Sequence, residues 1–218
     1  MIAHVNGIDL YYETTGAGRP LVMLHGNGED HTIFDAATDV LRGRFACICP
    51  DSRGHGQSTP MDELHYEDMA DDVIALLETL DLRDVVLYGF SDGGIVALLA
   101  ASRCSRITTL IVSGANLTPR GVKAWLRLQF RLSYLLHRGP KTALMMHEPN
   151  ITEDVLRRIG AKTLVLAGSR DLITERETRR IAAAIPGAEL RILDGEGHGT
   201  YIVHQRKIGE IILAFAAP

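Results

Sequence analysis

The strongest chemical signal in this sequence is a serine with a glycine two residues away on each side. Ser91 stands between Gly89 and Gly93, shortly after the apolar run 85–88 and before a helical pattern. This spacing is typical of a nucleophile elbow, in which a strand turns sharply into a helix and exposes one hydroxyl. The flanking positions must be small so that the two backbones can pass. A glycine-rich turn without chemical function is the alternative, because a chain with 21 glycines produces such spacings by chance.

A serine hydroxyl needs a base to take its proton, a carboxylate to orient that base, and fixed N–H donors for the oxyanion. Among nine histidines, His198 lies in a glycine-rich loop after the last short apolar run, where an imidazole can reach over a sheet. Asp171 closely follows the apolar run 164–168. The order Ser91, Asp171, His198 is the one expected when the elbow lies mid-sheet and its partners follow later strands.

The elements that must position these residues alternate between apolar runs and helical patterns. Residues 1–14 predict a hairpin around Asn6 and Gly7. The later apolar runs lack polar alternation, which is typical of a mostly parallel, doubly wound α/β sheet covered on both faces. We expect strands near 20–24, 44–49, 85–88, 107–112, 163–167 and 189–193, and helices near 30–41, 66–80, 94–102, 175–185 and 201–215. Ligands bind such sheets at the carboxyl ends of the strands.

Composition excludes several classes of function. The 218 residues predict one domain, and a net charge of −4 gives no reason to expect a nucleic-acid partner. No apolar run is long enough for a membrane span, and the N-terminus lacks a signal-peptide pattern, so we expect a cytoplasmic protein. Three cysteines, two of them (Cys47 and Cys49) on one face of a strand, predict buried free thiols. No metal-ligand cluster or phosphate-binding loop is evident, so we expect no cofactor.

With these motifs in order, the chain resembles the α/β-hydrolase family over nearly its whole length. Five segments carry the resemblance: 25–28, 51–58, 89–94, 168–171 and 197–199. The resemblance implies Ser91 as nucleophile, His198 as general base and Asp171 as the acid that orients it. It also implies an oxyanion hole formed by the backbone N–H groups of Asn27 and Asp92. The implied activity is cofactor-free hydrolysis of small carboxylic esters, lactones or thioesters through an acyl-enzyme.

Other polar residues compete for these roles. His25 and His55 lie in loops near the site, and in this family such residues shape loops by hydrogen bonding. Asp51 is interpreted as a structural acceptor for loop amides. Asn116 lies where some relatives keep the acid, but an amide cannot balance an imidazolium charge. Glu196 is two residues from the predicted base, and we expect it to point elsewhere.

Asp92 is unusual because a carboxylate beside the developing oxyanion opposes catalysis unless it points away. A helix dipole favours an acidic residue in the first turn. We therefore predict that Asp92 begins the helix and turns its side chain away from the site.

Residues 118–159 interrupt the sheet pattern with helical segments and predict a short helical cap. Between Thr118 and His147 there are six basic residues and no acidic one. Trp125, Leu126 and Met145 are the candidates for contact with substrate. The composition of the cap is compatible with three arrangements. The first is an apolar pocket with a basic rim for anionic esters, and the second is an amphipathic helix with its charges in water. The third is a surface that contacts a second subunit in a homodimer. We favour the second, with an open pocket for a small-molecule ester or acyl substrate.

Two other readings of function stay open at the sequence level. Relatives with the same triad cleave carbon–carbon bonds, make peracids or open enol-lactones, and the motif does not separate these activities. The same fold also serves as a non-catalytic receptor for small molecules.

Overall fold

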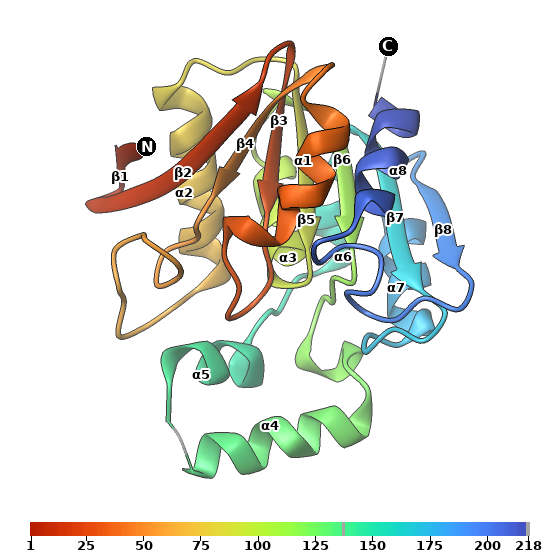
Figure 1. Cartoon of the computed structure of the whole chain (residues 1–218). Helices are drawn as coiled ribbons and strands as arrows, with labels where there is room; N and C mark the ends of the chain where they lie inside the picture. The colour runs from red at the N-terminus through yellow and green to blue at the C-terminus, as the bar shows by residue number, and fades with distance from the viewer. Residues whose placement is uncertain (137, 217–218) are drawn as a thin grey trace.

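An eight-stranded sheet forms the centre of the computed structural model, which describes residues 1–136 and 138–216 (Figure 1). The strand order is β1-β2-β4-β3-β5-β6-β7-β8. β1 and β2 pair antiparallel, as do β2 and β4, and every later neighbour is parallel. The predicted mostly parallel α/β sheet is confirmed. The strands are Ile2–Val5, Ile8–Gly16, Arg19–Leu24, Phe45–Pro50, Val85–Phe90, Ile107–Ser113, Lys162–Gly168 and Glu189–Leu193, numbered β1 to β8.

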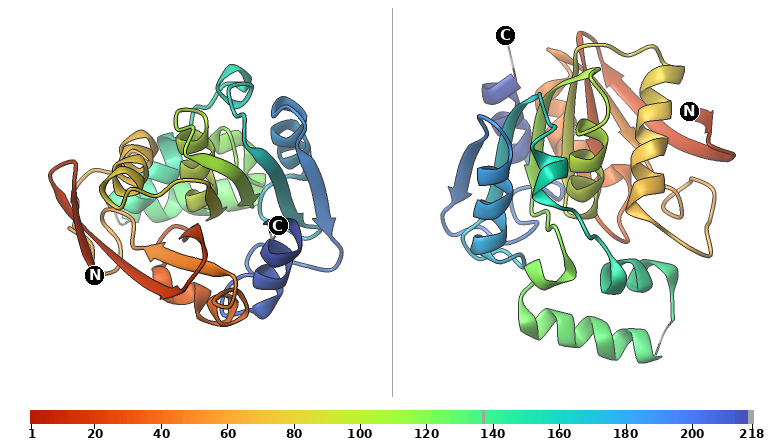
Figure 2. Two further views of the ribbon diagram at one scale, coloured as in Figure 1. Left: turned by 90° about the horizontal axis from the view of Figure 1, so that it is seen from above. Right: turned by 180° about the vertical axis from the view of Figure 1, so that it is seen from behind.

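Helices cover both faces of this sheet (Figure 2). One apolar core lies between the sheet and α2, α3 and α7, and the other between the sheet and α1 and α8. Burial on both faces explains why the central strands are continuous apolar runs. The helices are Asp35–Leu41, Tyr66–Thr79, Asp92–Ala101, Ala124–Leu136, Pro140–His147, Glu153–Leu156, Glu175–Ala184 and Arg206–Ala216, numbered α1 to α8, with 3-10 turns η1 at His31–Phe34 and η2 at Pro119–Gly121.

The first two strands form the predicted hairpin at the edge of the sheet. Asn6 and Gly7 have φ of 46° and 78°, as a two-residue turn with both central residues left-handed requires. Asn6 Nδ2 also donates to Asp72 Oδ1 at 2.9 Å, which ties the turn to α2.

Three helix starts differ from the sequence prediction. α1 begins at Asp35, after the 3-10 turn η1, instead of near residue 30. α3 begins at Asp92, at the elbow itself, and α8 begins at Arg206 instead of Tyr201. Tyr201 and Ile202 are fully buried in a turn against the core, and His204 has φ of 52°, which a continuous helix does not allow. Tyr201 and Ile202 are therefore apolar because they pack into the core from this turn, and not because they belong to the helix.

The segment predicted as a cap holds η2, α4, α5 and α6. In Figure 1, α4 and α5 lie beyond the carboxyl ends of the parallel strands. α6 instead packs against α3 and α7 in the body of the protein. Among the described residues no helix is long and apolar enough to cross a membrane.

The cysteines are as predicted. Cys47 and Cys49 on β4 and Cys104 after α3 are buried and free. Burial raises the pKa of the Cys47 thiol to about 12, so this group is protonated and unreactive at neutral pH.

Candidate active site

Ser91 lies at the turn between β5 and α3 in a strained backbone conformation. Its φ of 53° and ψ of −116° are rare for a residue with a side chain. The turn is tight: a Cβ on Gly89 would lie 2.2 Å from the carbonyl oxygen of Gly93. A Cβ on Gly93 would lie 2.3 Å from the carbonyl oxygen of Leu24 on β3. The two glycines are therefore required by close backbone contacts.

The three residues predicted to act together lie within hydrogen-bond distance. His198 Nε2 is 3.0 Å from Ser91 Oγ, and His198 Nδ1 is 2.7 Å from Asp171 Oδ1. Ser91 follows β5, Asp171 follows β7, and His198 lies in the loop between β8 and α8. The ring of Phe90 packs against the imidazole with centroids 4.9 Å apart. The arrangement has the geometry of a nucleophile, a base and an orienting acid.

Asp171 is ionised in its buried position. Burial raises the pKa of its carboxyl, but the hydrogen bond and charge of His198 and the amides of Ile173 and Gly168 outweigh burial and lower it. Asp171 Oδ1 accepts the Ile173 amide at 2.9 Å. An ionised carboxylate beside Nδ1 keeps the proton on that nitrogen, so Nε2 is left to accept the serine proton.

The two residues predicted to supply oxyanion donors are brought together by their side chains. Asn27 Nδ2 donates to Asp92 Oδ2 at 2.8 Å and is 3.3 Å from the carbonyl oxygen of Lys141. Asp92 is the first residue of α3, where amides have no acceptor within the helix. The neighbouring loop is held by Glu29, whose Oε2 accepts the Gly26 amide at 2.8 Å.

The direction of the Asp92 side chain differs from the prediction. Asp92 does begin the helix, but its side chain lines the same cavity as Ser91 and His198. Burial raises the pKa of the Asp92 carboxyl, and hydrogen bonds from Asn27 and Tyr66 partly offset this rise. The prediction was wrong because these two donors hold the carboxylate on the cavity side.

A small cavity of about 60 Å³ opens beside the serine. Leu126 and Phe130 of α4 and Met145 of α5 line its cap side. Trp125 is not among the lining residues and is 55% exposed. Neighbouring helical residues point about 100° apart, so Leu126 and Trp125 face different sides of α4. The predicted contact of Trp125 with substrate is corrected accordingly.

The charged residues of this cavity are acidic. Asp92 and Glu148 line it, and none of the described lining residues is lysine or arginine. Arg120, Arg127 and Arg131 border an adjoining hollow of about 380 Å³, which Met145 and Met146 of α5 also line. The predicted basic residues therefore border this neighbouring hollow, which shares Val122, Phe130 and Met145 with the cavity, and are not among the described residues that line the cavity itself.

The competing histidines have structural contacts. His25 is buried, and its Nδ1 is 2.8 Å from the Gly26 carbonyl oxygen while Nε2 accepts the Ser52 amide at 3.0 Å. His55 Nδ1 is 3.0 Å from the Arg53 carbonyl oxygen, and burial lowers the pKa of His55 to about 4. Both rings hold loops beside the strand ends, in agreement with the sequence interpretation.

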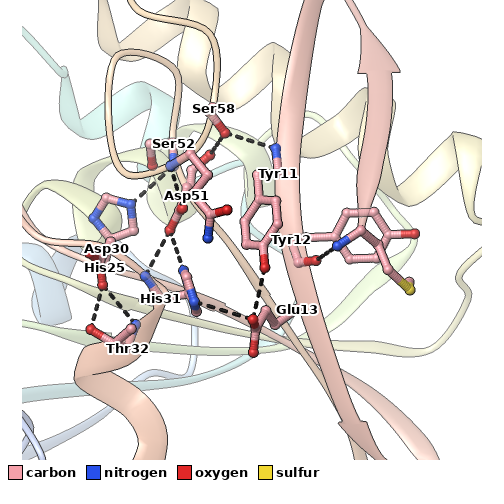
Figure 3. Close-up of polar contacts among 12 residues, drawn as sticks. Tyr11, Tyr12, Glu13, His25, Asp30, His31, Thr32, Asp51, Ser52 and Ser58 are labelled. Carbon is pink, nitrogen blue, oxygen red and sulfur yellow. Dashed lines mark hydrogen bonds and ion pairs between the residues drawn. The ribbon is translucent and has the colours of Figure 1, made fainter.

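Asp51 is an acceptor within a polar network, shown in Figure 3. Its Oδ1 lies 2.8 Å from both the amide and Nδ1 of His31, and its Oδ2 accepts the Gln57 amide at 2.8 Å. Asp30, His31 and Asp51 lie close enough to share a metal ion, but these groups already bond to one another and to backbone amides. The structural interpretation of Asp51 is confirmed.

Three residues of the site were not found from the sequence. Gly114 follows β6 with φ of 64°, and a Cβ there would lie 2.7 Å from His198 Cε1. Tyr66 at the start of α2 and Glu148 after α5 line the cavity. Gly114 could have been found from the sequence, because a glycine at a strand end is a recognisable signal. Tyr66 gave no signal because it fitted the helical pattern of α2, and Glu148 gave none because it lay beyond the basic stretch of the cap.

Comparison with known proteins identifies the family of this chain. A family model described as "Alpha/beta hydrolase family" matches residues 21–150. The chain belongs to the α/β-hydrolase family. The AB hydrolase superfamily protein YisY of Bacillus subtilis (strain 168) is 28% identical, with 96% of each chain covered. The serine hydrolase BPHL of Mus musculus is 27% identical over 91% of this chain and 79% of its own.

A solved structure has the same fold. The enol-lactonase from Burkholderia xenovorans LB400 superposes with a TM-score of 0.82, covers 100% of both chains and is 21% identical. A similarity at 21% identity shows only that the two proteins share a fold. The two relatives named above are hydrolases, and we accordingly describe the chain as an α/β-hydrolase enzyme.

Proposed function

We propose that this enzyme is a serine hydrolase of small carboxylic esters, lactones or thioesters, acting through an acyl-enzyme. The observation that carries the proposal is the continuous hydrogen-bonded path from Ser91 Oγ through His198 to Asp171. A hydroxyl at a strained elbow beside an oriented imidazole is suited to nucleophilic attack on an acyl carbon. The serine hydrolase and the enol-lactonase among the similar proteins lend support.

The mechanism follows from the roles of these atoms. Ser91 Oγ bonds to the acyl carbon while His198 Nε2 takes its proton, and the carbonyl oxygen becomes an oxyanion facing the amides of Asn27 and Asp92. His198 then gives the proton to the leaving alcohol or thiol as the acyl–oxygen or acyl–sulfur bond breaks. Water loses a proton to His198 and attacks the acyl-enzyme. The acid leaves, and the proton returns to Ser91.

The charge of the cavity bears on the substrate. Asp92 and Glu148 line it, and the described lining residues hold no lysine or arginine. A carboxylate on the acyl group would meet like charges there, whereas an ammonium group would be attracted. We therefore favour neutral or positively charged esters over anionic ones. Glu148 is already paired with His65 at 2.6 Å, so Asp92 is the main source of this preference.

A rate comparison over three p-nitrophenyl esters of equal acyl length tests the proposal, with the chain end neutral, ammonium or carboxylate. We expect kcat/KM for the carboxylate ester to be about tenfold or more below the other two at low salt. Ser91→Ala should remove turnover of all three. Equal rates on the three esters would reject the charge preference without affecting the triad.

The alternatives remain carbon–carbon bond hydrolysis, perhydrolysis and non-catalytic binding. A fluorophosphonate probe separates the last from the others because it reacts only with an activated serine. We expect labelling of the native enzyme and none of Ser91→Ala. Folded native protein that resists the probe would favour a receptor, and labelling without ester turnover would favour one of the other triad reactions.

A further inference from the structure

The outward side of α4 carries a stripe of exposed apolar side chains. These make up five of the seven large hydrophobic residues that are exposed in the described part of the chain. At about 100° per residue they fall within a sector of roughly 100° on one side of the helix. We call this set the outer stripe: Trp125, Leu128, Leu132, Leu135 and Leu136, with exposed fractions of 53–77%.

The outer stripe is separate from the cavity wall. Leu126 and Phe130, on the other side of α4, line the cavity. α4 packs against α5 and η2, and none of its residues is buried. Figure 1 shows α4 as the outermost element at this end of the molecule. The helix therefore has one apolar face directed at the site and another that no described element covers.

Positive charge lies beside the outer stripe. The residues from Thr118 to His147 carry six basic side chains and no acidic one, although the whole protein has a net charge of −4. Arg131 lies roughly 40° beyond the edge of the stripe on the helical projection, with Arg127 on the same flank. Exposed tryptophan and leucine on one face, with basic residues beside them, are typical of helices that lie in a membrane interface.

We propose that the outer stripe of α4 docks on an anionic lipid surface. With 13 residues, α4 can lie in the interface but is too short to span a bilayer. A second copy of the chain is a poorer partner, because a two-fold contact through this helix would bring Arg127 and Arg131 of one copy close to the same cations of the other. Anionic headgroups would neutralise them while the stripe enters the acyl boundary. The proposal concerns binding alone and does not depend on which ester the enzyme cleaves.

The protein carries its own probe for this contact. Trp125 is the only tryptophan in the sequence and lies in the outer stripe. Its emission can be followed while vesicles are added to the native enzyme. We expect a blue shift with vesicles of phosphatidylcholine and phosphatidylglycerol, weakening as salt is raised, and little change with phosphatidylcholine alone.

Two pairs of substitutions separate the apolar from the charged contribution in vesicle co-sedimentation. Leu132→Gln with Leu136→Gln should reduce binding to the anionic vesicles by about tenfold or more, because both side chains are exposed in the free protein. Arg131→Gln with Arg138→Gln should reduce it by about tenfold. Arg44→Gln with Arg176→Gln changes the charge equally at exposed positions on the body of the protein and should bind as the native enzyme does.

Circular dichroism and turnover of a soluble ester should be unchanged in the leucine pair and in the pair Arg131→Gln with Arg138→Gln. These two controls distinguish loss of folding from loss of binding. Absence of binding to anionic vesicles by the native enzyme would overturn the proposal. Sedimentation velocity that shows a dimer broken by Leu132→Gln with Leu136→Gln, without vesicle binding, would overturn it in favour of a second copy. Equal binding of the three substituted proteins would also overturn it.

Discussion

The side chains of Asn27 and Asp92 are joined by a hydrogen bond of 2.8 Å from Nδ2 to Oδ2. Asn27 lies in the loop after β3, and Asp92 begins α3 directly after Ser91. The bond links the two segments whose amides we propose as oxyanion donors. The bond therefore fixes the distance between the two donor amides without involving any reacting atom. Preorganised donors stabilise an oxyanion most when they need not move during the reaction.

The first prediction concerns this bond. Asn27→Ala keeps the backbone amide but removes the link to Asp92, so the proposed oxyanion donors lose their fixed separation. We expect kcat to fall about tenfold to a hundredfold with little change in KM, because the oxyanion forms only in the transition state. Steady-state rates on a neutral ester measure this. Asn150→Ala is the control, since it loses a 3.0 Å bond to the His147 carbonyl oxygen at an exposed position. A change confined to KM would contradict the prediction.

The second prediction is the effect of the acid on rate. Asp171→Asn replaces the ionised group beside His198 Nδ1 with an amide, so the imidazole is held less well in the tautomer that accepts the serine proton. We expect kcat to fall by about 10³-fold or more. Two measurements check this prediction: the rate of ester turnover and the rate of labelling by a fluorophosphonate probe. Both depend on the activation of Ser91. If the fluorophosphonate probe labelled Asp171→Asn as fast as the native enzyme, the orienting acid would be a residue other than Asp171.

The third prediction is the pH dependence of stability at the same residue. The pKa of Asp171 is lowered in the folded protein. Its charged form therefore stabilises the fold at pH values above its unfolded pKa of about 4, and this contribution is lost as pH falls through the lowered pKa. Urea unfolding should show Asp171→Asn less stable than native at pH 7, with the difference shrinking below about pH 4. A difference that stays constant with pH would mean that ionisation is not its source.

The fourth prediction concerns the pH dependence of stability at Asp92, where the expected effect has the opposite sign to that at Asp171. Burial raises the pKa of Asp92, so its charged form opposes folding, and stability is lost as pH rises through the window between the unfolded and folded values. Asp92→Asn should therefore raise Tm at pH 7, by about 2–4 °C for a gain of about 1 kcal/mol in a protein of this size. The gain should vanish below about pH 4. Thermal unfolding over that range measures it, and a lower Tm at pH 7 would refute it.

The same substitution tests the charge of the cavity. Asp92→Asn should remove the disadvantage of the ester with a carboxylate end and any advantage of the one with an ammonium end. The ratio of their kcat/KM values is the measurement. Glu196→Gln is the charge-matched control, because Glu196 pairs with Lys207 at 2.5 Å instead of lining the cavity. If the ratio is unchanged in Asp92→Asn, the preference does not come from Asp92.

The sequence predicted the parts of this site that depend on local signals. Strand ends are marked by where an apolar run stops, and side chains at the carboxyl ends of parallel strands meet at one edge of the sheet. Ser91, Asp171 and His198 each follow such a run closely, so their meeting could be anticipated without coordinates. The elbow was visible because close backbone contacts admit only glycine at positions 89 and 93.

Features set by long-range contacts were not predictable. The direction of the Asp92 side chain depends on Asn27, 65 positions away in the sequence, and on Tyr66. The face of α4 that lines the cavity depends on how the helix docks, so Leu126 and Trp125 were indistinguishable as apolar neighbours. Tyr201 and Ile202 continue the apolar pattern of α8 but are buried in a turn before it. In each case tertiary packing decided what periodicity alone could not.

The fifth prediction concerns a glycine that supports the base. Gly114 has φ of 64°, and a Cβ there would lie 2.7 Å from His198 Cε1, so Gly114→Ala should push the imidazole away from Ser91. We expect kcat to fall about a hundredfold, because small displacements of catalytic groups are costly. Gly187→Ala is a matched control, since Gly187 has φ of 68° with nothing within 4 Å of its Cβ position. Both substitutions should lower Tm through backbone strain, but only Gly114→Ala should lower kcat. Equal kcat values in the two would show that His198 does not depend on the space beside Gly114.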